Sequence, residues 1–280
     1  MRGWAFLAAQ QDETGFWEED WRLPVGSSRM WTTAYVGWRL ATSGGGSSDP
    51  EMLRRAADWL EANELPQGGW GYTALAGTDA DSTALGVLFL TELGRRAPEG
   101  ALQRLLSFAR KDGGFGTYGA EQSFGSWTAS QVEVTATAAL ALRKARGEGE
   151  TVHRAERFLY ERRGIDGLWD SYWWTAPFYA TEVSARLLGD GARQAAAHAL
   201  RGLPPANAFE QALRSLVMRE TAGDLGEGQL PDGSWPSAPV LRLTRRDVFE
   251  PRQSANPGPC FADQRRLFTT ATVLAALGLD

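Results

Sequence analysis

The chain has 280 residues, of which 43% are hydrophobic, and 29 basic against 34 acidic side chains give a formal net charge of −5. This balance provides no basic patch for nucleic acid, so we exclude nucleic acid as a partner. One cysteine, Cys260, and two histidines, His153 and His198, are too few for a disulfide framework or a Cys/His zinc site.

Five copies of one phrase, a glycine followed by an aromatic residue and usually preceded by an acid, punctuate the chain. Their aligned glycines stand 45 to 66 residues apart, a spacing close to that of two helices with their connections. The chain is therefore a repeat protein. In chain order the phrases are Gln11–Trp17, Glu64–Trp70, Ala109–Phe115, Arg163–Trp169 and Gln229–Trp235.

Two kinds of helix alternate between these phrases. The first kind is rich in small residues and opens with Thr or Ser before Ala, at Thr33, Thr83, Thr135, Ser184 and Thr270, with a weaker copy at Gln211. The second kind is amphipathic and includes 4–10, 49–64 and 192–203. Helices that are apolar on most sides must be enclosed, whereas amphipathic helices coat a core. The sequence therefore predicts an all-α fold, a single (α/α)6 toroid of inner and outer helices.

The chain begins on an outer-type helix and ends on an inner-type helix, 267–277, so the ring can close on itself. One repeat is degenerate. Between the fourth and fifth phrases we expect inner helix 180–188, outer helix 192–203 and inner helix 209–219, and the sixth outer element, within 221–230, has room for only a turn or two. We expect one toroid domain over 1–280, with a long loop, 236–263, covering one mouth.

No apolar run approaches the ~18 residues of a membrane span, and the apolar run in 1–9 is too short for a signal peptide. We expect a cytoplasmic protein without a transmembrane segment. Peripheral contact with a membrane stays open.

The glutamine, acid-glycine and tryptophan phrases resemble the QW repeats of squalene-hopene cyclases and class II terpene cyclases, and six alternating helix pairs resemble the α/α toroid of that superfamily. The resemblance covers nearly the whole chain, and Gln229–Trp235 is a close match. It implies acid-initiated cyclisation of a hydrophobic small molecule, in particular an isoprenoid. It also implies no redox cofactor and no metal, except that a diphosphate substrate could bind together with Mg²⁺.

Asp79-Ala80-Asp81-Ser82-Thr83-Ala84 is similar to the Asp-x-Asp-Asp motif of class II cyclases. The resemblance implies that Asp81 donates the proton and that Asp79 tunes it. Ser82 departs from the motif at the third acid. Protonating an alkene requires a neutral but strong acid, which burial, like charge and hydrogen bonding can create.

Aligning the inner helices on their threonine position places one residue of each helix at the same depth of the cavity. In the cyclisation that the resemblance implies, acidic side chains at this depth would begin the reaction, and aromatic side chains would stabilise the cations that follow. Two residues before the threonine position stand Trp31, Asp81, Glu133, Glu182, Phe209 and Phe268. Further aromatic residues precede these helices, and we expect Phe124, Trp127, Trp173, Trp174 and Tyr179 to bind substrate.

Several alternatives remain open. Asp79 and Asp81 could be helix caps, and Arg29 and Arg266 could meet a diphosphate or pair with acids. A second toroid or a homo-oligomer could complete the site. Besides cyclisation, the chain could bind an isoprenoid without catalysis or cyclise a non-terpenoid compound, whereas protein prenyl transfer is disfavoured because neither histidine lies on an inner helix.

Overall fold

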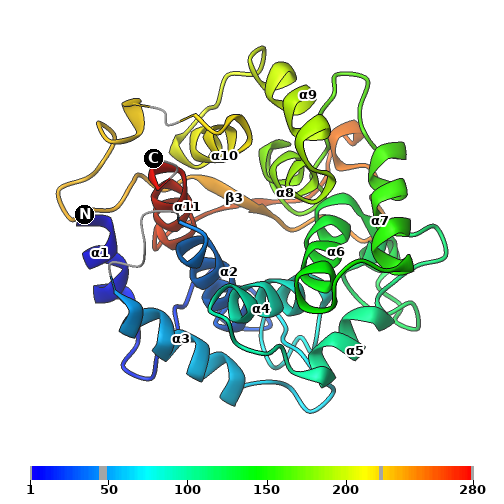
Figure 1. Ribbon diagram of the computed structural model, residues 1–280, viewed down its shortest axis with the longest axis horizontal. Coiled ribbons are helices and arrows are strands. Elements are labelled where there is room, and N and C mark those ends of the chain that lie inside the picture. Colours follow the sequence, from blue (N-terminus) through cyan, green and yellow to red (C-terminus); the bar gives the residue numbers. More distant parts are fainter. Residues whose placement is uncertain (1, 44–48, 221–222, 279–280) are drawn as a thin grey trace.

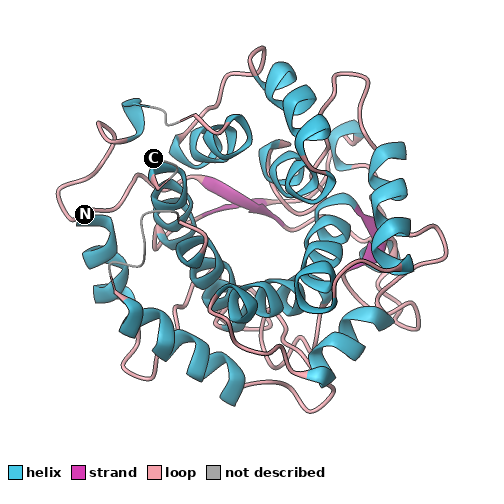
Figure 2. Cartoon of the chain, in the orientation of Figure 1, coloured by secondary structure: helices cyan, strands magenta, loops and turns pink. Residues whose placement is uncertain are grey.

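The computed structural model describes residues 2–43, 49–220 and 223–278, and helices dominate it (Figure 2). The inner helices pack in a closed cycle, in which α2 contacts α4, then α6, α8, α10 and α11 follow, and α11 returns to α2. Figure 1 shows this ring with the outer elements around it. The inner helices are α2 (Met30–Ala41), α4 (Ala80–Glu92), α6 (Val132–Arg146), α8 (Phe178–Leu188), α10 (Ala208–Met218) and α11 (Leu267–Leu277).

The outer elements coat this ring with one apolar face each. In α7, for example, Val152, Ala155, Phe158 and Leu159 are buried, whereas α4 buries every residue from Ala80 to Leu90. The predicted helical toroid is confirmed. The outer helices are α1 (Arg2–Gln10), α3 (Pro50–Ala62), α5 (Glu99–Ser107), α7 (Glu150–Glu161) and α9 (Asp190–Leu200).

The glycine-aromatic phrases join outer to inner helices through one repeated pair of hydrogen bonds. The indole N–H of each phrase tryptophan donates to the carbonyl ten residues earlier, as from Trp70 to Leu60 at 2.8 Å. The backbone N–H of the same tryptophan donates to an inner-helix threonine hydroxyl, here Thr83 at 3.1 Å. The same indole bond recurs at Trp17, Trp169 and Trp235.

The alignment of the fourth repeat on Ser184 is wrong. The backbone N–H of Trp169 donates to the hydroxyl of Thr181 at 3.1 Å, so Thr181 occupies the threonine position. Two residues before it stands Tyr179, and Glu182 therefore does not belong to the ring of residues at one depth. The fourth inner helix has Thr181-Glu182 where α2, α4, α6 and α11 have Thr-Ala, and this difference hid the correct alignment.

The sixth outer position holds no full-length helix among the described residues, as the sequence indicates. Between α10 and the last phrase the described residues hold only the 3₁₀ turn η2 (Gly223–Leu225), while Thr221 and Ala222 lie outside the described residues. The N-terminal helix α1 packs against the last inner helix, α11, and this contact closes the outer layer.

Four short strands were not predicted. β1 (Phe115–Gly116) pairs with β2 (Ser130–Gln131) before α6, and β3 (Pro239–Arg242) pairs antiparallel with β4 (Cys260–Ala262). The second pair lies within segment 236–263, which also holds the 3₁₀ turn η3 (Pro251–Gln253). Figure 1 shows β3 crossing behind the opening of the helix ring. Within the described residues, none of the helices combines the length and the apolar character that crossing a membrane requires.

Candidate active site

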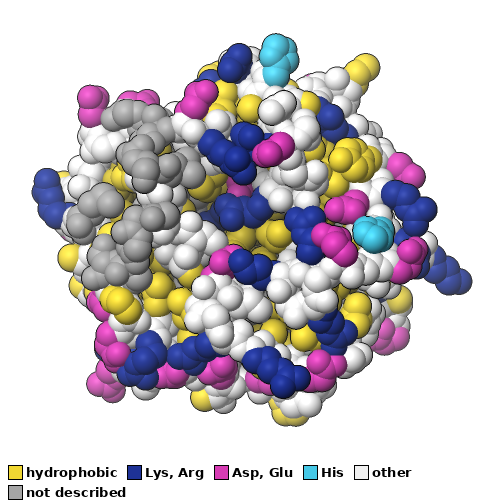
Figure 3. All heavy atoms as spheres, in the orientation of Figure 1, with side chains coloured by type: hydrophobic (Ala, Val, Ile, Leu, Met, Phe, Trp, Pro, Cys, Tyr) yellow, Lys and Arg dark blue, Asp and Glu magenta, His cyan; other side chains and the backbone are white. Residues whose placement is uncertain are grey.

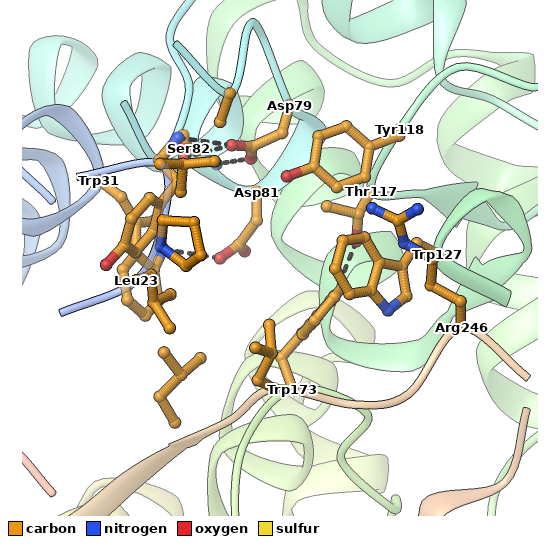
Figure 4. Close-up of a pocket in the computed structure, with 16 residues that line it drawn as sticks. Leu23, Trp31, Asp79, Asp81, Ser82, Thr117, Tyr118, Trp127, Trp173 and Arg246 are labelled. Atoms are coloured by element: carbon orange, nitrogen blue, oxygen red, sulfur yellow. Dashed lines mark hydrogen bonds between the residues drawn. The ribbon is translucent and has the colours of Figure 1, made fainter. Parts of the chain in front are cut away.

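A cavity of about 370 Å³ lies at the N-terminal ends of α2 and α4 (Figure 4). This volume falls near the lower end of the range of small-molecule sites, ~300–1,000 Å³. Its wall is mainly apolar and aromatic, with two carboxyl groups and one guanidinium. The lining residues are Leu23, Pro24, Val25, Trp31, Tyr72, Ala76, Asp79, Asp81, Ser82, Thr117, Tyr118, Trp127, Trp173, Leu241, Leu243 and Arg246.

Asp81 lies in the first turn of α4 and lines this cavity, with 8% of its surface exposed. The indole N–H of Trp31 donates to its Oδ2 at 2.8 Å, and the Thr137 hydroxyl lies 3.3 Å from Oδ1. Burial raises the pKa of Asp81 to about 6, and the hydrogen bonds from Trp31 and Thr137 oppose that rise. Asp81 is thus a buried acid whose conjugate base already has a hydrogen-bond donor in place.

Asp79 is the N-cap of α4. Its Oδ1 accepts from the Ser82 N–H at 2.7 Å, and its Oδ2 accepts from the Ser82 hydroxyl and the Tyr72 N–H, both at 2.8 Å. Burial raises the pKa of Asp79 to about 7, the hydrogen bonds lower it, and the charge of Asp81 raises it. Asp79 is therefore both the helix cap and part of the cavity wall, and Ser82, which also lines the cavity, donates its hydroxyl proton to Asp79.

Asp79 and Asp81 stand two residues apart at the start of α4, and the pKa values of both are raised. Asp79 accepts three hydrogen bonds, so all its recorded partners favour the carboxylate. The hydroxyl of Thr137 lies closer to the Glu133 carbonyl, at 2.8 Å, than to Asp81 Oδ1. Its single proton is shared between these acceptors, so Thr137 stabilises the Asp81 carboxylate less than the Trp31 N–H does. Asp79 thus accepts more hydrogen bonds than Asp81, yet its pKa is the higher of the two, about 7 against about 6, because the charge of Asp81 adds to the effect of burial.

Glu133 is fully buried and does not line the cavity. Its Oε1 accepts from the backbone N–H groups of Tyr172 at 2.8 Å and Trp173 at 2.6 Å, while its Oε2 has no hydrogen-bond partner among the described residues. Burial raises the pKa of Glu133 to about 7. Glu133 thus anchors the loop that carries Trp173 into the cavity wall.

Glu182 lies away from the cavity, in a buried cluster of charges. Its carboxylate pairs with Arg39 at 2.9 Å and with Arg186 at 2.8 Å. Burial raises the pKa of Glu182, but the two arginines outweigh that effect and lower it. An ionised carboxylate held by two cations is a poor proton donor, so the assignment of Glu182 as a catalytic acid is corrected to a structural ion pair between α2 and α8.

Aromatic side chains fill the ring beneath the cavity instead of lining it. Trp174 stacks on Tyr179 with ring centroids 3.9 Å apart and on Phe209 at 5.6 Å. Phe268 packs against Trp31 at 4.9 Å. Trp174, Tyr179, Phe209 and Phe268 are all buried and absent from the lining. We expected these four residues to line the cavity and bind substrate, and the structure instead places them in its floor, because large rings fill the space where six helices converge.

Of the other expected aromatic residues, Trp31, Trp127 and Trp173 line the cavity. Phe124 packs against Trp127 and Tyr118 just behind the wall. Tyr72 and Tyr118, which sequence reasoning missed, also line it. Both follow a glycine-aromatic phrase by two or three residues, so their place after the phrase was an available signal.

The two expected arginines lie outside the lining. Arg29 pairs with Glu18 at 2.6 Å and Arg266 with Asp232 at 2.9 Å, both at the surface. The cation that does line the cavity is Arg246, in segment 236–263. On the face in Figure 3, basic and acidic side chains surround the centre of the ring. The described residues contain no group of His, Cys, Asp and Glu side chains that could hold a metal ion.

No protein-family model matches the chain. Among curated proteins it is similar to two drimenyl diphosphate synthases. The one from Streptomyces showdoensis is 29% identical over 222 residues, 75% of this chain and 38% of the relative. The one from Streptantibioticus cattleyicolor is 31% identical over 167 residues, 57% of this chain and 30% of the relative. The chain therefore spans less than half the length of the curated relatives it matches.

Solved structures match the chain over nearly its whole length. A protein from Actinoplanes is 26% identical, with a TM-score of 0.88 and coverage of 99% of this chain and 97% of that one. The type II terpene cyclase MstE from Scytonema is 25% identical, with a TM-score of 0.86 and coverage of 99% and 95%. A variant of that cyclase was solved in complex with its substrate, geranylgeranyl dihydroxybenzoate, and matches equally well.

Proposed function

We propose that this chain, which is class II terpene cyclase-like in its repeats and its fold, cyclises an isoprenoid substrate in the cavity described above. Asp81 is the proton donor. The observation that carries the proposal is a buried, cavity-lining carboxyl group that has a raised pKa and an indole N–H on one oxygen. A general acid works best when its pKa lies near the working pH.

The reaction begins when the Asp81 O–H bond breaks and its proton adds to a terminal double bond of the substrate. The π electrons form the new C–H bond, and the positive charge that remains on the neighbouring carbon is attacked by the next double bond. Trp31, Trp127 and Trp173 present rings to the cavity, and each contact with a cation is worth roughly 0.5 to 2 kcal/mol. Loss of a proton from the last cation makes the overall change an isomerisation.

Asp79 tunes this acid. Whenever Asp79 is ionised, Ser82 and the Tyr72 N–H hold its carboxylate, and its negative charge near Asp81 favours the protonated form of Asp81. Ser82 replaces the third acid of the cyclase motif by donating its hydroxyl proton to Asp79. This substitution stabilises the Asp79 carboxylate without adding a third negative charge to a buried site.

We further propose that residues 1–280 act as one toroid domain with its own complete site, in the cytoplasm and without a redox cofactor. Coverage of 95% of MstE by this one chain supports a single toroid, although the drimenyl diphosphate synthases are much longer. Segment 236–263 contributes Leu241, Leu243 and Arg246 to the cavity wall, which supports its role as a cover for this mouth. A diphosphate substrate would bring Mg²⁺ with it.

The test compares Asp81→Asn and Asp81→Ala with the wild type on linear prenyl diphosphates, geranylgeranyl dihydroxybenzoate and squalene. Cyclic products are identified by mass spectrometry. Asn retains an acceptor for the Trp31 N–H but has no acidic proton, so product should fall by ~10²-fold or more while the melting temperature changes little. If Asp81→Asn kept its activity and only Asp81→Ala lost it, Asp81 would be removed from the mechanism, and Asp79 would be the remaining acid of the cavity wall. Tight binding by a wild type that forms no product would favour a non-catalytic binding protein.

A further inference from the structure

Arg246 is the one lining residue of the cavity that carries a positive charge. Its guanidinium lies over the ring of Phe124 and over the ring of Trp127, 4.6 Å from each centroid. Among the described residues it makes no ion pair and donates no side-chain hydrogen bond, whereas the neighbouring Arg245 pairs with Asp247 at 2.8 Å. The N–H groups of Arg246 are therefore available to a ligand.

The backbone holds Arg246 at this place. The carbonyl of Arg246 accepts hydrogen bonds from the N–H and the hydroxyl of Ser126, at 2.8 and 3.0 Å. Ser126 belongs to the 3₁₀ turn η1 (Gly125–Thr128), and Gly125 has a φ of +60°. A Cβ on Gly125 would lie 2.2 Å from the Arg246 carbonyl oxygen, so only glycine permits this contact. The indole N–H of Trp127 fixes the same segment by donating to the Thr244 carbonyl at 2.7 Å.

The cavity thus combines an acid and a cation in a mainly apolar wall. Figure 4 shows Arg246 beside Trp127, at a different part of the wall from Asp81. Leu241, Leu243 and Trp173 line the same space. A ligand that satisfies both groups has an anionic head and an apolar tail whose reactive end reaches the acid.

We propose that Arg246 binds a carboxylate head group of the substrate, which makes the substrate an isoprenoid acid or a prenylated aromatic acid. The inference rests on the proposed function of the same cavity. A planar guanidinium forms two parallel hydrogen bonds with one carboxylate. A diphosphate carries more negative charge and calls for several cationic donors, and the lining supplies one. Arg246 is accordingly a specificity-determining residue that holds the head while the far end of the tail meets Asp81.

The test uses three ligands with the same tail and different heads: farnesoic acid, farnesol and farnesyl diphosphate. The short tail suits the small cavity, and quenching of the lining tryptophans reports binding. Arg246→Gln should weaken binding of farnesoic acid by about 10- to 100-fold and leave farnesol unchanged, because only the acid loses a charge-assisted pair. Arg246→Lys keeps the charge but lacks the planar guanidinium, so its affinity for farnesoic acid should lie between those of the wild type and Arg246→Gln. Arg245→Gln, one residue away and outside the lining, is the matched control and should behave as the wild type.

Equal effects of Arg246→Gln on the acid and the alcohol would overturn the proposal. The proposal would also be overturned if farnesyl diphosphate bound more tightly than farnesoic acid and if Arg246→Gln removed that difference. The head group would then be a diphosphate. Cyclisation is scored separately. A preference for the acid that depends on Arg246, without cyclic products from any substrate, supports the head-group assignment and counts against the cyclase. Asp81-dependent cyclisation that is indifferent to Arg246 supports the cyclase and overturns the assignment.

Discussion

The acidity of Asp81 results from two opposed effects on one side chain. Burial disfavours the charged form and raises the pKa, while the N–H of Trp31 stabilises the carboxylate and lowers it. A proton donor to an alkene needs both, because it must be protonated before the reaction and stable as an anion after it. Trp31 therefore acts twice, as a hydrogen-bond donor to the acid and as a ring in the cavity wall.

Replacing Trp31 with Phe separates these two contributions. Product formation by a general acid falls as the pH rises through its pKa, here about 6, because the reactive form is protonated. Trp31→Phe keeps an aromatic ring but removes the N–H, so the pKa of Asp81 should rise and this falling limb should move to higher pH. The rate on the low-pH plateau should drop, because the Asp81 carboxylate that proton transfer leaves behind loses the Trp31 N–H as a hydrogen-bond donor. Both are read from pH–rate profiles.

Trp173→Phe is the matched control for this variant. Trp173 also lines the cavity, but its indole N–H donates to the Thr117 hydroxyl at 2.7 Å instead of to an acid. Its pH–rate profile should keep the position of the wild-type limb. A shift of the same size in both variants would attribute the effect to general loss of packing.

At the scale of elements, the glycine-aromatic phrase is a joint between three helices. Its indole bonds to the outer helix before it, its backbone bonds to the inner helix after it, and its glycine packs against the next outer helix. The glycine contact is close, since a Cβ on Gly68 would lie 2.4 Å from the Gly100 carbonyl oxygen, and Gly15, Gly113 and Gly233 make the same approach to other helices. This shared contact explains why the phrase repeats.

Gly68→Ala tests the joint against Gly94→Ala. Both glycines have a positive φ, +85° and +72°, but a Cβ on Gly94 would meet no atom within 4 Å. Gly94→Ala should cost the left-handed backbone penalty alone, ~1–2 kcal/mol of unfolding free energy. Gly68→Ala adds a clash with backbone that cannot rotate away, and should cost ~3 kcal/mol or more. Denaturant unfolding measures both, and equal losses would show that backbone conformation, and not packing, requires the glycine.

At the scale of the whole molecule, buried polar groups join the segments that precede the first and last inner helices, α2 and α11. Trp21 donates its indole N–H to the Ala262 carbonyl at 2.7 Å, and Glu19 accepts from the Arg265 N–H at 3.0 Å. Glu19 and Asp263 are both buried and lie against each other. Burial and the neighbouring Asp263 raise the pKa of Glu19 to about 8.

The buried carboxyl groups predict that stability falls as pH rises. The pKa values of Glu19, Glu133, Asp79 and Asp81 are all raised in the folded state, to about 8, 7, 7 and 6. Between about pH 5 and pH 8 the folded protein therefore holds protons that the unfolded chain has released. The melting temperature should drop by about 5 °C or more across this range. Glu182, whose pKa is lowered, affects stability only at more acidic pH.

Thermal unfolding of Glu19→Gln against the wild type assigns part of this slope. Gln is neutral at every pH and nearly the same size, so the variant should lose less stability toward pH 8. A melting temperature that climbs from pH 5 to pH 8 in the wild type would contradict the raised pKa values.

The sequence by itself determined the helical toroid, the closure of its ring, the weak outer position near η2 and the acid motif on α4. These depend on local patterns, because helix periodicity and a phrase that makes the same contacts in every repeat act over a few residues. The resemblance to cyclases rests on the same short phrases. Where the phrase was present but the following residues differed, as at Thr181, the alignment slipped by three residues and moved Glu182 into the ring.

Only the tertiary structure decided what each of these side chains faces. Trp174 and Trp173 are neighbours in sequence, yet one stacks in the floor and the other lines the cavity. Arg39 neutralises Glu182 from across the ring, and no local pattern links two helices that far apart in the chain. Arg246 reaches the cavity because η1 holds its carbonyl, a contact between segments 120 residues apart. Such contacts depend on how the chain closes in space, so burial, pairing and the lining of the site follow from the closed ring and not from the repeat that builds it.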